Sequence, residues 1–245
     1  MESISLFPFG GNERILDIGS GDGVISSLLA KRAHKGSVLG IDIDPEMVAY
    51  ARATSNRANL AFEVADAEEM AFESEFDLAT IFFTYEWLSH REPVIRGCYR
   101  SLVPGGRLWI VVPVDMPKEL KESAELIAGQ DKWREFFDGF VSSATFPSMR
   151  ETEELLLHSG FGPIASRVRK KEMLFPTREA FHRTLLATFP YLDPLPDERK
   201  EEFITDLLDR YVVYHPIDPQ GRLLCPLEIA QWIAVKRDPL NLLHQ

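Results

Sequence analysis

The sequence predicts an α/β fold in which a doubly wound, mostly parallel sheet of seven strands is covered by helices. Short apolar runs alternate with helical stretches from Arg14 to Val114, and the connections between them are short. This alternation predicts parallel strands, because right-handed crossovers return the chain to the same end of the sheet and place helices on both faces. Two further strand-like runs follow in the second half of the chain and complete the sheet.

Composition excludes several classes of protein. The chain has 245 residues, which suits one domain with insertions. Its 27 Lys and Arg residues against 38 Asp and Glu residues give a net charge of −11, which argues against a nucleic-acid or anionic-membrane partner. The two cysteines, Cys98 and Cys225, lie far apart, so neither a disulfide scaffold nor a thiolate metal cluster is expected. Without a recognisable signal peptide or a long apolar run, the expected location is the cytoplasm.

The first half of the chain carries clear boundaries. The expected strands are 15–18, 37–41, 60–64, 78–83 and 108–112. Asp44 is a good helix N-cap and Pro45 a good first helical residue, which predicts a helix through about Thr54. Ser89 and Glu92 have the spacing of a capping box that opens the helix before the fifth strand.

The second half is richer in helices. Residues 116–140 have the pattern of one or two amphipathic helices, and two more helical stretches lie between 177 and 215. A capping box at Ser148 and Glu151 predicts a helix through His158, and the last strands are expected at 164–174 and 227–235. The interpretation is one domain, 1–245, with a ligand-binding core at 12–114 and helical lid or substrate insertions at 115–150 and 175–222.

A glycine-rich turn, residues 17–23, stands directly between the first strand and the first helix. Such a turn lets a ligand approach the backbone, where the N–H groups of the helix start face it. Asp42 ends the second strand about twenty residues later, where a carboxylate can accept both hydroxyls of a ribose, and Asp66 ends the third strand. The alternatives are a turn without a ligand, a dinucleotide site, and helix capping by Asp17 and Asp66.

Four segments together resemble the motifs of the class I S-adenosylmethionine-dependent methyltransferases, a Rossmann-like family. The string ILDIGSGDGVIS is similar to their first motif, GIDIDPEMV to the second and VADAEEMAF to the third. SLVPGGRLWIVVP is similar to the turn before their fifth strand. Order and spacing agree over roughly residues 12–114, and four matches in register are more specific than one.

The resemblance implies S-adenosylmethionine as cofactor and assigns a role to each matching position. Asp17, with the backbone of Gly19, Ser20, Gly21 and Gly23, would hold the methionine end. Asp42 would bind the ribose, Ile43 would pack on the adenine, Asp66 would meet the adenine amino group, and the Ala67 N–H would face a ring nitrogen. The backbone at Phe82 would contact the methionine ammonium group. Family members often have a small polar residue there, so Phe82-Phe83 departs from the pattern and makes the methyl-transfer end aromatic.

The segment TYEWLSH and the C-terminal helices resemble the trans-aconitate and juvenile-hormone-acid methyltransferases, a small-molecule group. This resemblance implies a carboxylate acceptor, which needs alignment and desolvation but no general base. Tyr85, Trp87 and His182 are the candidate acceptor contacts, and Glu86 is the candidate catalytic residue. Similar sequences often have Gln or His at position 86, and a carboxylate there would repel an anionic acceptor.

Three functions therefore remain open. The favoured one is methyl transfer to an oxygen, carboxylate or hydroxyl, of a small molecule. The second is an N- or C-methyltransferase that uses Glu86 or a histidine as base. The third is a cofactor-binding protein that does not methylate. No histidine pair has the spacing of a metal site, so no metal is expected. About a dozen residues precede Arg14, where relatives place a helix over the cofactor, so the chain is a fragment, or the insertions or a neighbouring subunit close the pocket.

Overall fold

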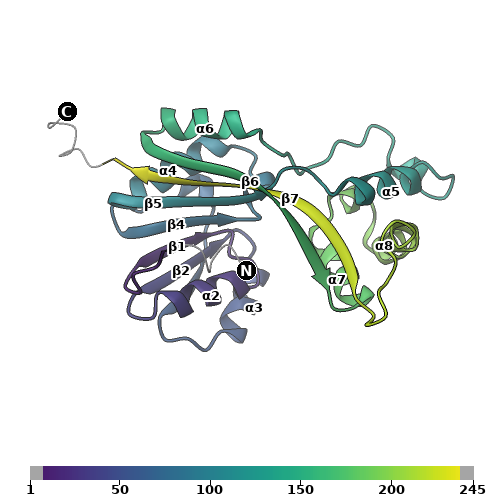
Figure 1. The fold of residues 1–245 in the computed structure, drawn as a ribbon, viewed down its shortest axis with the longest axis horizontal. Helices are drawn as coiled ribbons and strands as arrows, with labels where there is room; N and C mark the ends of the chain where they lie inside the picture. Colours follow the sequence, from purple (N-terminus) through teal and green to yellow (C-terminus); the bar gives the residue numbers. More distant parts are fainter. Residues whose placement is uncertain (1–7, 238–245) are drawn as a thin grey trace. The chain divides into compact units, whose positions relative to one another are not determined.

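The computed structural model describes residues 8–237, which form a seven-stranded sheet in the order β3-β2-β1-β4-β5-β7-β6 (Figure 1). The strands are β1 (Arg14–Ile18), β2 (Ser37–Asp42), β3 (Leu60–Val64), β4 (Phe76–Phe82), β5 (Leu102–Pro113), β6 (Phe161–Phe175) and β7 (Leu223–Lys236). The pairs β1–β2, β2–β3, β1–β4 and β4–β5 are parallel, whereas β7 is antiparallel. The predicted doubly wound, mostly parallel sheet is confirmed.

The helices divide between two compact units of the chain. They are α2 (Val24–Arg32), α3 (Pro45–Thr54), α4 (Arg91–Ser101), α5 (Lys118–Ala128), α6 (Met149–His158), α7 (Arg178–Thr188) and α8 (Asp197–Tyr211), with 3₁₀ turns η1 (Ala67–Glu69), η2 (Tyr85–Trp87), η3 (Arg134–Phe136) and η4 (Pro190–Leu192). Within residues 8–237, the first unit comprises 8–112, 147–167 and 230–237, and the second comprises 113–146 and 168–229. The second unit overlaps both predicted insertions, and their role as a lid stays a prediction.

Helix α3 begins where the sequence predicts. The Asp44 carboxylate accepts hydrogen bonds from the backbone N–H groups of Glu46 and Met47, and Pro45 is the first helical residue. The cap satisfies two donors that have no partner inside a helix, and proline has no N–H to satisfy. The capped start of α3 at Pro45 therefore follows closely on Asp42, the last residue of β2.

The capping box predicted at Ser89 and Glu92 is wrong. Helix α4 begins at Arg91 with His90 as its N-cap, and no side chain caps it. The backbone N–H and the Nδ1 atom of His90 bind the two carboxylate oxygens of Glu68 instead, at 3.0 and 2.9 Å. Because of this contact, helix α4 begins one residue later than the capping-box pattern indicates. The Glu92 carboxylate forms an ion pair with Arg96 instead of a cap. The second box is confirmed: the Ser148 hydroxyl accepts from the Glu151 N–H, and the Glu151 carboxylate accepts from the Ser148 N–H.

These two serines make a matched pair for a stability test. Ser148→Ala should lower the free energy of unfolding by about 1 kcal/mol, because it leaves the Glu151 N–H at the start of α6 without its acceptor. Ser89→Ala should change it by less than about 0.5 kcal/mol, as is usual for an exposed position without a cap. Urea unfolding followed by circular dichroism measures both. Equal losses at the two positions would contradict the assignment of His90 as the N-cap.

The second unit has a core of its own. Buried side chains of α5, α7 and α8 pack with Trp133, whose ring meets Phe203 edge-on at 5.2 Å. The Trp133 indole N–H donates to Asp206 at 2.9 Å, so the buried ring keeps its polar atom satisfied. Residues 116–140 form one helix, α5, and the short turn η3, which is within the predicted range of one or two helices.

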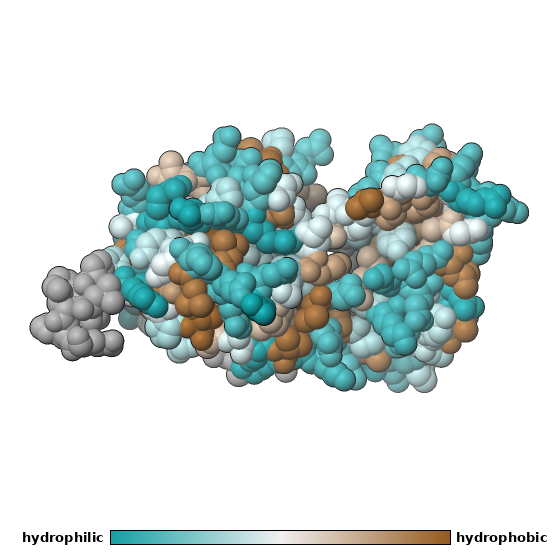
Figure 2. Space-filling view, turned by 90° about the horizontal axis from the view of Figure 1, so that it is seen from above, coloured by the Kyte–Doolittle hydropathy of each residue, from teal (hydrophilic) through white to brown (hydrophobic). Residues whose placement is uncertain are grey.

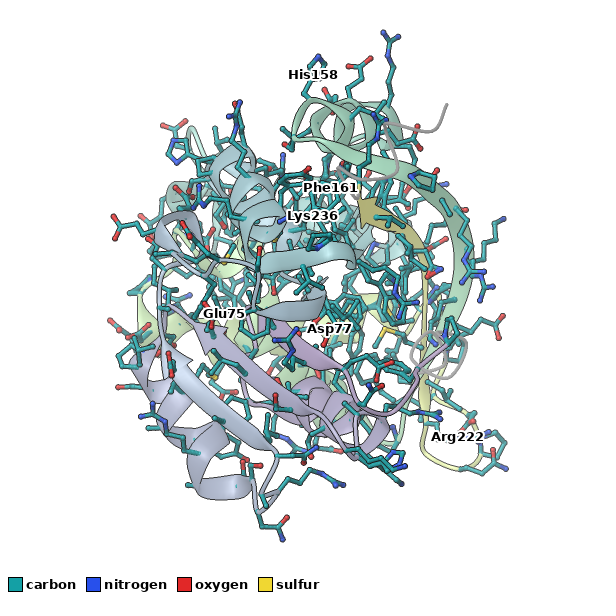
Figure 3. The ribbon with its side chains drawn as sticks, turned by 90° about the vertical axis from the view of Figure 1, so that its left-hand side faces the viewer. Glu75, Asp77, His158, Phe161, Arg222 and Lys236 are labelled. Carbon is teal, nitrogen blue, oxygen red and sulfur yellow. The ribbon has the colours of Figure 1, made fainter. Side chains whose placement is uncertain are left out.

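Strands β6 and β7 are longer than predicted. Their ends in the first unit, Phe161 and Lys236, are labelled in Figure 3. The ring of Tyr99 on α4 meets Phe161 edge-on at 5.2 Å, and the Lys236 ammonium lies 4.9 Å from the Tyr99 ring centroid. Lys236 also donates to the backbone oxygen of Leu102 at 2.6 Å. These contacts join α4 and β5 to the two last strands.

The face of the molecule in Figure 2 carries mainly hydrophilic residues, with apolar ones in separate patches between them. Among the helices of residues 8–237, none combines the length and the apolarity that crossing a bilayer requires. In the same residues, no group of three or more His, Cys, Asp or Glu side chains is placed to hold a metal ion.

Candidate cofactor and acceptor site

The glycine-rich turn is held against β2 by its own backbone. The N–H groups of Gly19 and Ser20 donate to the Ile41 oxygen at 2.8 and 2.9 Å. Gly19 has φ +70°, and a Cβ there would lie 2.2 Å from Thr84, so this position requires glycine. Gly21 has φ +52°, and a Cβ there would meet no heavy atom within 4 Å. The turn is therefore packed at Gly19 and open at Gly21, where a ligand can approach the backbone.

Asp42 joins the end of β2 to this turn. One carboxylate oxygen accepts the Gly21 N–H at 2.7 Å, and the other accepts the Asp44 N–H at 3.0 Å. The side chain is half-buried, so part of it still faces outward. The next residue, Ile43, is 67% exposed. A carboxylate beside an exposed apolar side chain suits a ribose next to a flat base, as the sequence predicts.

Asp17 lies inside the turn rather than on its surface. It is 2% exposed, and its two carboxylate oxygens accept from the Ser26 hydroxyl and the Thr80 hydroxyl, each at 2.6 Å. Burial raises the pKa of Asp17 to about 6, against the lowering effect of these hydrogen bonds. Asp17 therefore links the end of β1 to α2 and β4, and its contact with the methionine end stays a prediction.

The Asp17 pKa predicts a dependence of stability on pH. Its folded pKa, about 6, lies above the ordinary value of 3.8, so the folded state binds the proton more tightly than the unfolded state. The stability that this proton contributes is lost as the pH rises from about 4 to 6. Asp17→Asn removes this titration and should make the free energy of unfolding less dependent on pH, with a difference between wild type and variant that changes by about 3 kcal/mol over this range. Urea unfolding at pH values from 4 to 7.5 measures the difference. A constant difference would contradict the raised pKa.

Asp66 and Ala67 mark the end of β3. Asp66 is the N-cap of η1, and its carboxylate accepts the Glu68 N–H at 2.8 Å. Asp66 therefore caps a helical turn, as the alternative of helix capping predicts for this residue. Both residues are half-buried. A carboxylate has more than one acceptor position, so the cap does not exclude a hydrogen bond from the adenine amino group. That contact stays a prediction.

The residues after β4 connect the acceptor candidates to the glycine turn. Phe82 is buried, and its ring meets Trp109 edge-on at 4.8 Å. Phe83 is 40% exposed and has φ +56°, a left-handed conformation that is uncommon for a bulky residue. The Thr84 hydroxyl lies 3.2 Å from the backbone oxygens of both Gly19 and Phe82. Thr84 therefore fixes the start of η2 beside the glycine turn.

The three candidate residues of η2, the acceptor contacts Tyr85 and Trp87 and the catalytic candidate Glu86, differ in exposure. Tyr85 is fully buried, whereas Trp87 is 37% exposed. Glu86 is 5% exposed, and its Oε2 atom has no hydrogen-bond partner among the described residues. Burial raises the pKa of Glu86 to about 7. Trp87 is therefore the ring that a small molecule can reach, and Glu86 is a polar group held inside the fold.

His182 belongs to the second unit. Its Nε2 atom lies 3.3 Å from a carboxylate oxygen of Glu201, and its side chain is 20% exposed. It lines a cavity of about 390 Å³ with Arg178, Glu179, Arg183 and Thr205. His182 thus lines a cavity of its own unit, and its contact with an acceptor stays a prediction.

Thr80, Ser26 and Thr84 are site residues that the sequence reasoning missed. A signal was present for Thr80, because it is the one polar side chain within the apolar run LATIF and lies beside Asp17 in the β1–β4 register. The other two hydroxyl residues carry no such signal, since their partners, the Asp17 carboxylate and the Gly19 oxygen, are defined only by the folded turn.

The residues at these strand ends fit S-adenosylmethionine. The backbone is open at Gly21, the Asp42 carboxylate is half-buried beside it, and the apolar side chain of Ile43 is exposed. The buried Ser20 hydroxyl oxygen, which has no partner among the described residues, adds a polar atom to the turn. These features supply polar groups for the ribose and the amino acid and an apolar surface for the base.

Comparison with known proteins identifies the class. Residues 16–110 match the model of the methyltransferase domain family. With its sheet order and glycine turn, the chain is a class I S-adenosylmethionine-dependent methyltransferase, and its cofactor is S-adenosylmethionine.

Named relatives extend the similarity beyond the matched segment. The chain is 27% identical over 226 residues to trans-aconitate 2-methyltransferase of Methylobacterium nodulans, covering 89% of this chain and 85% of that one. It is 25% identical over 214 residues to juvenile hormone acid O-methyltransferase of Drosophila melanogaster, covering 81% and 71%. The crystal structure of the YcgJ protein from Bacillus subtilis has the same fold, with a TM-score of 0.61, 19% identity and 97% of each chain covered.

Proposed function

We propose that the chain methylates an oxygen of a small-molecule acceptor, and that this acceptor is a carboxylate. The observation that carries the proposal is the Thr84 hydroxyl contact with Gly19, because it holds Tyr85, Glu86 and Trp87 beside the cofactor turn. The two relatives named for acids are similar over more than four fifths of this chain, so the similarity includes this segment as well as the cofactor motifs.

The bound cofactor supplies a methyl group on a positively charged sulfur, and the protein supplies position. Asp42 and the Gly21 backbone would hold the ribose, and the turn ordered by Asp17 would fix the methionine end. The exposed rings of Phe83 and Trp87 would exclude water from the acceptor. A carboxylate is already nucleophilic, so alignment and desolvation suffice.

A second candidate is transfer to a nitrogen or carbon with Glu86 as base. The observation that favours it is the pKa of Glu86, which burial raises to about 7 and so into the range of a general base. A third candidate, binding without methyl transfer, shares the whole cofactor site. The cytoplasm is the proposed compartment, since Cys98 and Cys225 are both free thiols.

Two measurements separate these functions. Calorimetry with S-adenosylmethionine and with S-adenosylhomocysteine tests cofactor binding. A donor-consumption assay against trans-aconitate, long-chain fatty acids, phenols and primary amines tests the acceptor. Turnover with the acids alone supports the proposal, and turnover with phenols alone keeps an oxygen acceptor but rejects the carboxylate. Turnover with amines replaces the proposal by the second candidate, and binding without turnover on any class supports the third.

A further inference from the structure

Glu86 combines burial with an unsatisfied polar atom. The residue is 5% exposed, and Oε2 is buried without a hydrogen-bond partner among the described residues. A buried polar atom without a partner is costly, and native proteins retain few of them outside functional sites. Burial also disfavours the ionised form of a carboxyl group and favours the neutral acid. An O–H group at this position is a donor that needs an acceptor.

Neighbouring segments place this donor at the end of the central strands. Strand β4 lies beside β1, where the strand order reverses, and ligands bind at such a point in open α/β sheets. The Thr84 hydroxyl donates to the Gly19 backbone oxygen at 3.2 Å, and the backbone N–H of Trp87 donates to the Thr84 backbone oxygen at 2.9 Å. Glu86 lies between these two anchored residues, so its backbone is held beside the glycine turn, and its buried carboxyl group belongs to the same short turn η2.

The charged groups around Glu86 leave its neutral form accessible near pH 7. Burial raises the pKa of Glu86 to about 7, against the lowering effects of a hydrogen bond from its own backbone N–H and of the positive charge of Arg91 at the start of α4. The Arg91 guanidinium is engaged elsewhere: it donates to the Tyr85 oxygen at 3.1 Å and lies 5.2 Å from the Tyr85 ring centroid. On the neighbouring helix α6, Glu151 also interacts with Arg91. The phenol of Tyr85, whose pKa burial raises, is neutral as well.

We propose that Glu86 acts as a neutral carboxylic acid whose O–H donates a hydrogen bond to the carboxylate of the acceptor, and so selects anionic acids over neutral acceptors. This inference rests on the proposed function. In the step itself, one acceptor oxygen forms the bond to the methyl carbon while the bond from sulfur to that carbon breaks and its electron pair stays on sulfur. The other acceptor oxygen accepts the Glu86 hydrogen bond, and Glu86 keeps its proton throughout. The repulsion expected of an ionised Glu86 is thereby removed.

The proposal predicts the opposite pH dependence from a general base. Wild-type kcat/KM for an acid should be highest below pH 6.5 and fall above pH 7, to about one thirtieth at pH 8.5, because the fraction of Glu86 that is protonated falls tenfold per pH unit. Glu86→Gln keeps a neutral donor that does not titrate, so its profile should be flat and should exceed wild type about tenfold at pH 8.5. Glu86→Leu should lower kcat/KM at every pH.

Infrared spectroscopy supplies a readout that does not depend on turnover. The difference spectrum between wild type and Glu86→Gln at pH 6 should contain the band of a protonated carboxyl group, and that band should disappear with a midpoint near pH 7. Glu92→Gln is the matched control, since Glu92 is an exposed carboxylate paired with Arg96 on α4, and it should leave both the band and the pH profile in place.

Each outcome decides between the roles. A wild-type rate that rises toward pH 7, with an inactive Glu86→Gln, would make Glu86 a base and overturn the proposal. Identical profiles for wild type and Glu86→Gln, or a missing infrared band, would also overturn it. Turnover with amines alone would reject the proposed function, whereas turnover with acids at a rate independent of Glu86 would reject only this inference.

Discussion

Gly19→Ala is expected to lower the free energy of unfolding by about 2–4 kcal/mol and the affinity for S-adenosylmethionine by about a hundredfold. A Cβ at this position would lie 2.2 Å from both Cγ2 and Oγ1 of Thr84, and φ +70° is a conformation that alanine rarely adopts. The turn would have to move away from η2. Because the Gly19 N–H also binds the Ile41 oxygen, that movement would disturb the ligand-facing backbone as well. Urea unfolding and calorimetry measure the two losses.

Two further variants separate the steric effect from the backbone effect. Gly105 has φ +79° but open space around its Cβ position, so Gly105→Ala should cost only the conformational strain, about 1–2 kcal/mol, and leave affinity unchanged. Thr84→Gly removes the three atoms that a Cβ at position 19 would meet. The double variant should therefore lose less stability than the sum of its single changes. Additive losses would contradict a direct clash between positions 19 and 84.

The sheet and most helix boundaries could be predicted because their signals are local. Asp44 and Pro45 define the start of α3 through contacts with residues two and three positions away, and Ser148 with Glu151 defines α6 in the same way. The same spacing failed at Ser89, where the deciding contact joins His90 to Glu68, 22 residues earlier in the chain. A local pattern does not contain a partner so distant in sequence.

Site chemistry depends more on such distant partners. The sequence marks Asp17 as part of the turn, but its burial under Ser26 and Thr80 follows from the alignment of β1 with β4. Glu86 is a surface-type residue by composition, and only the packing of η2 makes it a buried acid. The conformation of the glycine turn can therefore be predicted from glycines and spacing, whereas the burial of an acidic side chain cannot.

Asp42→Ala is expected to reduce the affinity for S-adenosylmethionine and for S-adenosylhomocysteine by about a hundredfold each. The cofactor would lose the hydrogen bonds that we expect its ribose to make with the Asp42 carboxylate. Hydrogen bonds to charged groups are worth about 1.5–3 kcal/mol. The Gly21 and Asp44 N–H groups, now bound at 2.7 and 3.0 Å, would lose their acceptor too. Equal effects on both ligands are expected because they share the ribose and differ in the methyl group. Calorimetry on folded protein measures both.

Asp44→Ala is the matched control, since it makes the same change two residues later. Asp44 caps α3, so its removal should cost about 1 kcal/mol of stability while affinity stays within about twofold. Asp42→Asn should fall between wild type and Asp42→Ala, because one amide oxygen can still accept an N–H while the amide nitrogen cannot. If Asp42→Ala binds the two ligands as wild type does, the ribose is held elsewhere. The residues at the ends of β1 and β2 would then not form the cofactor site.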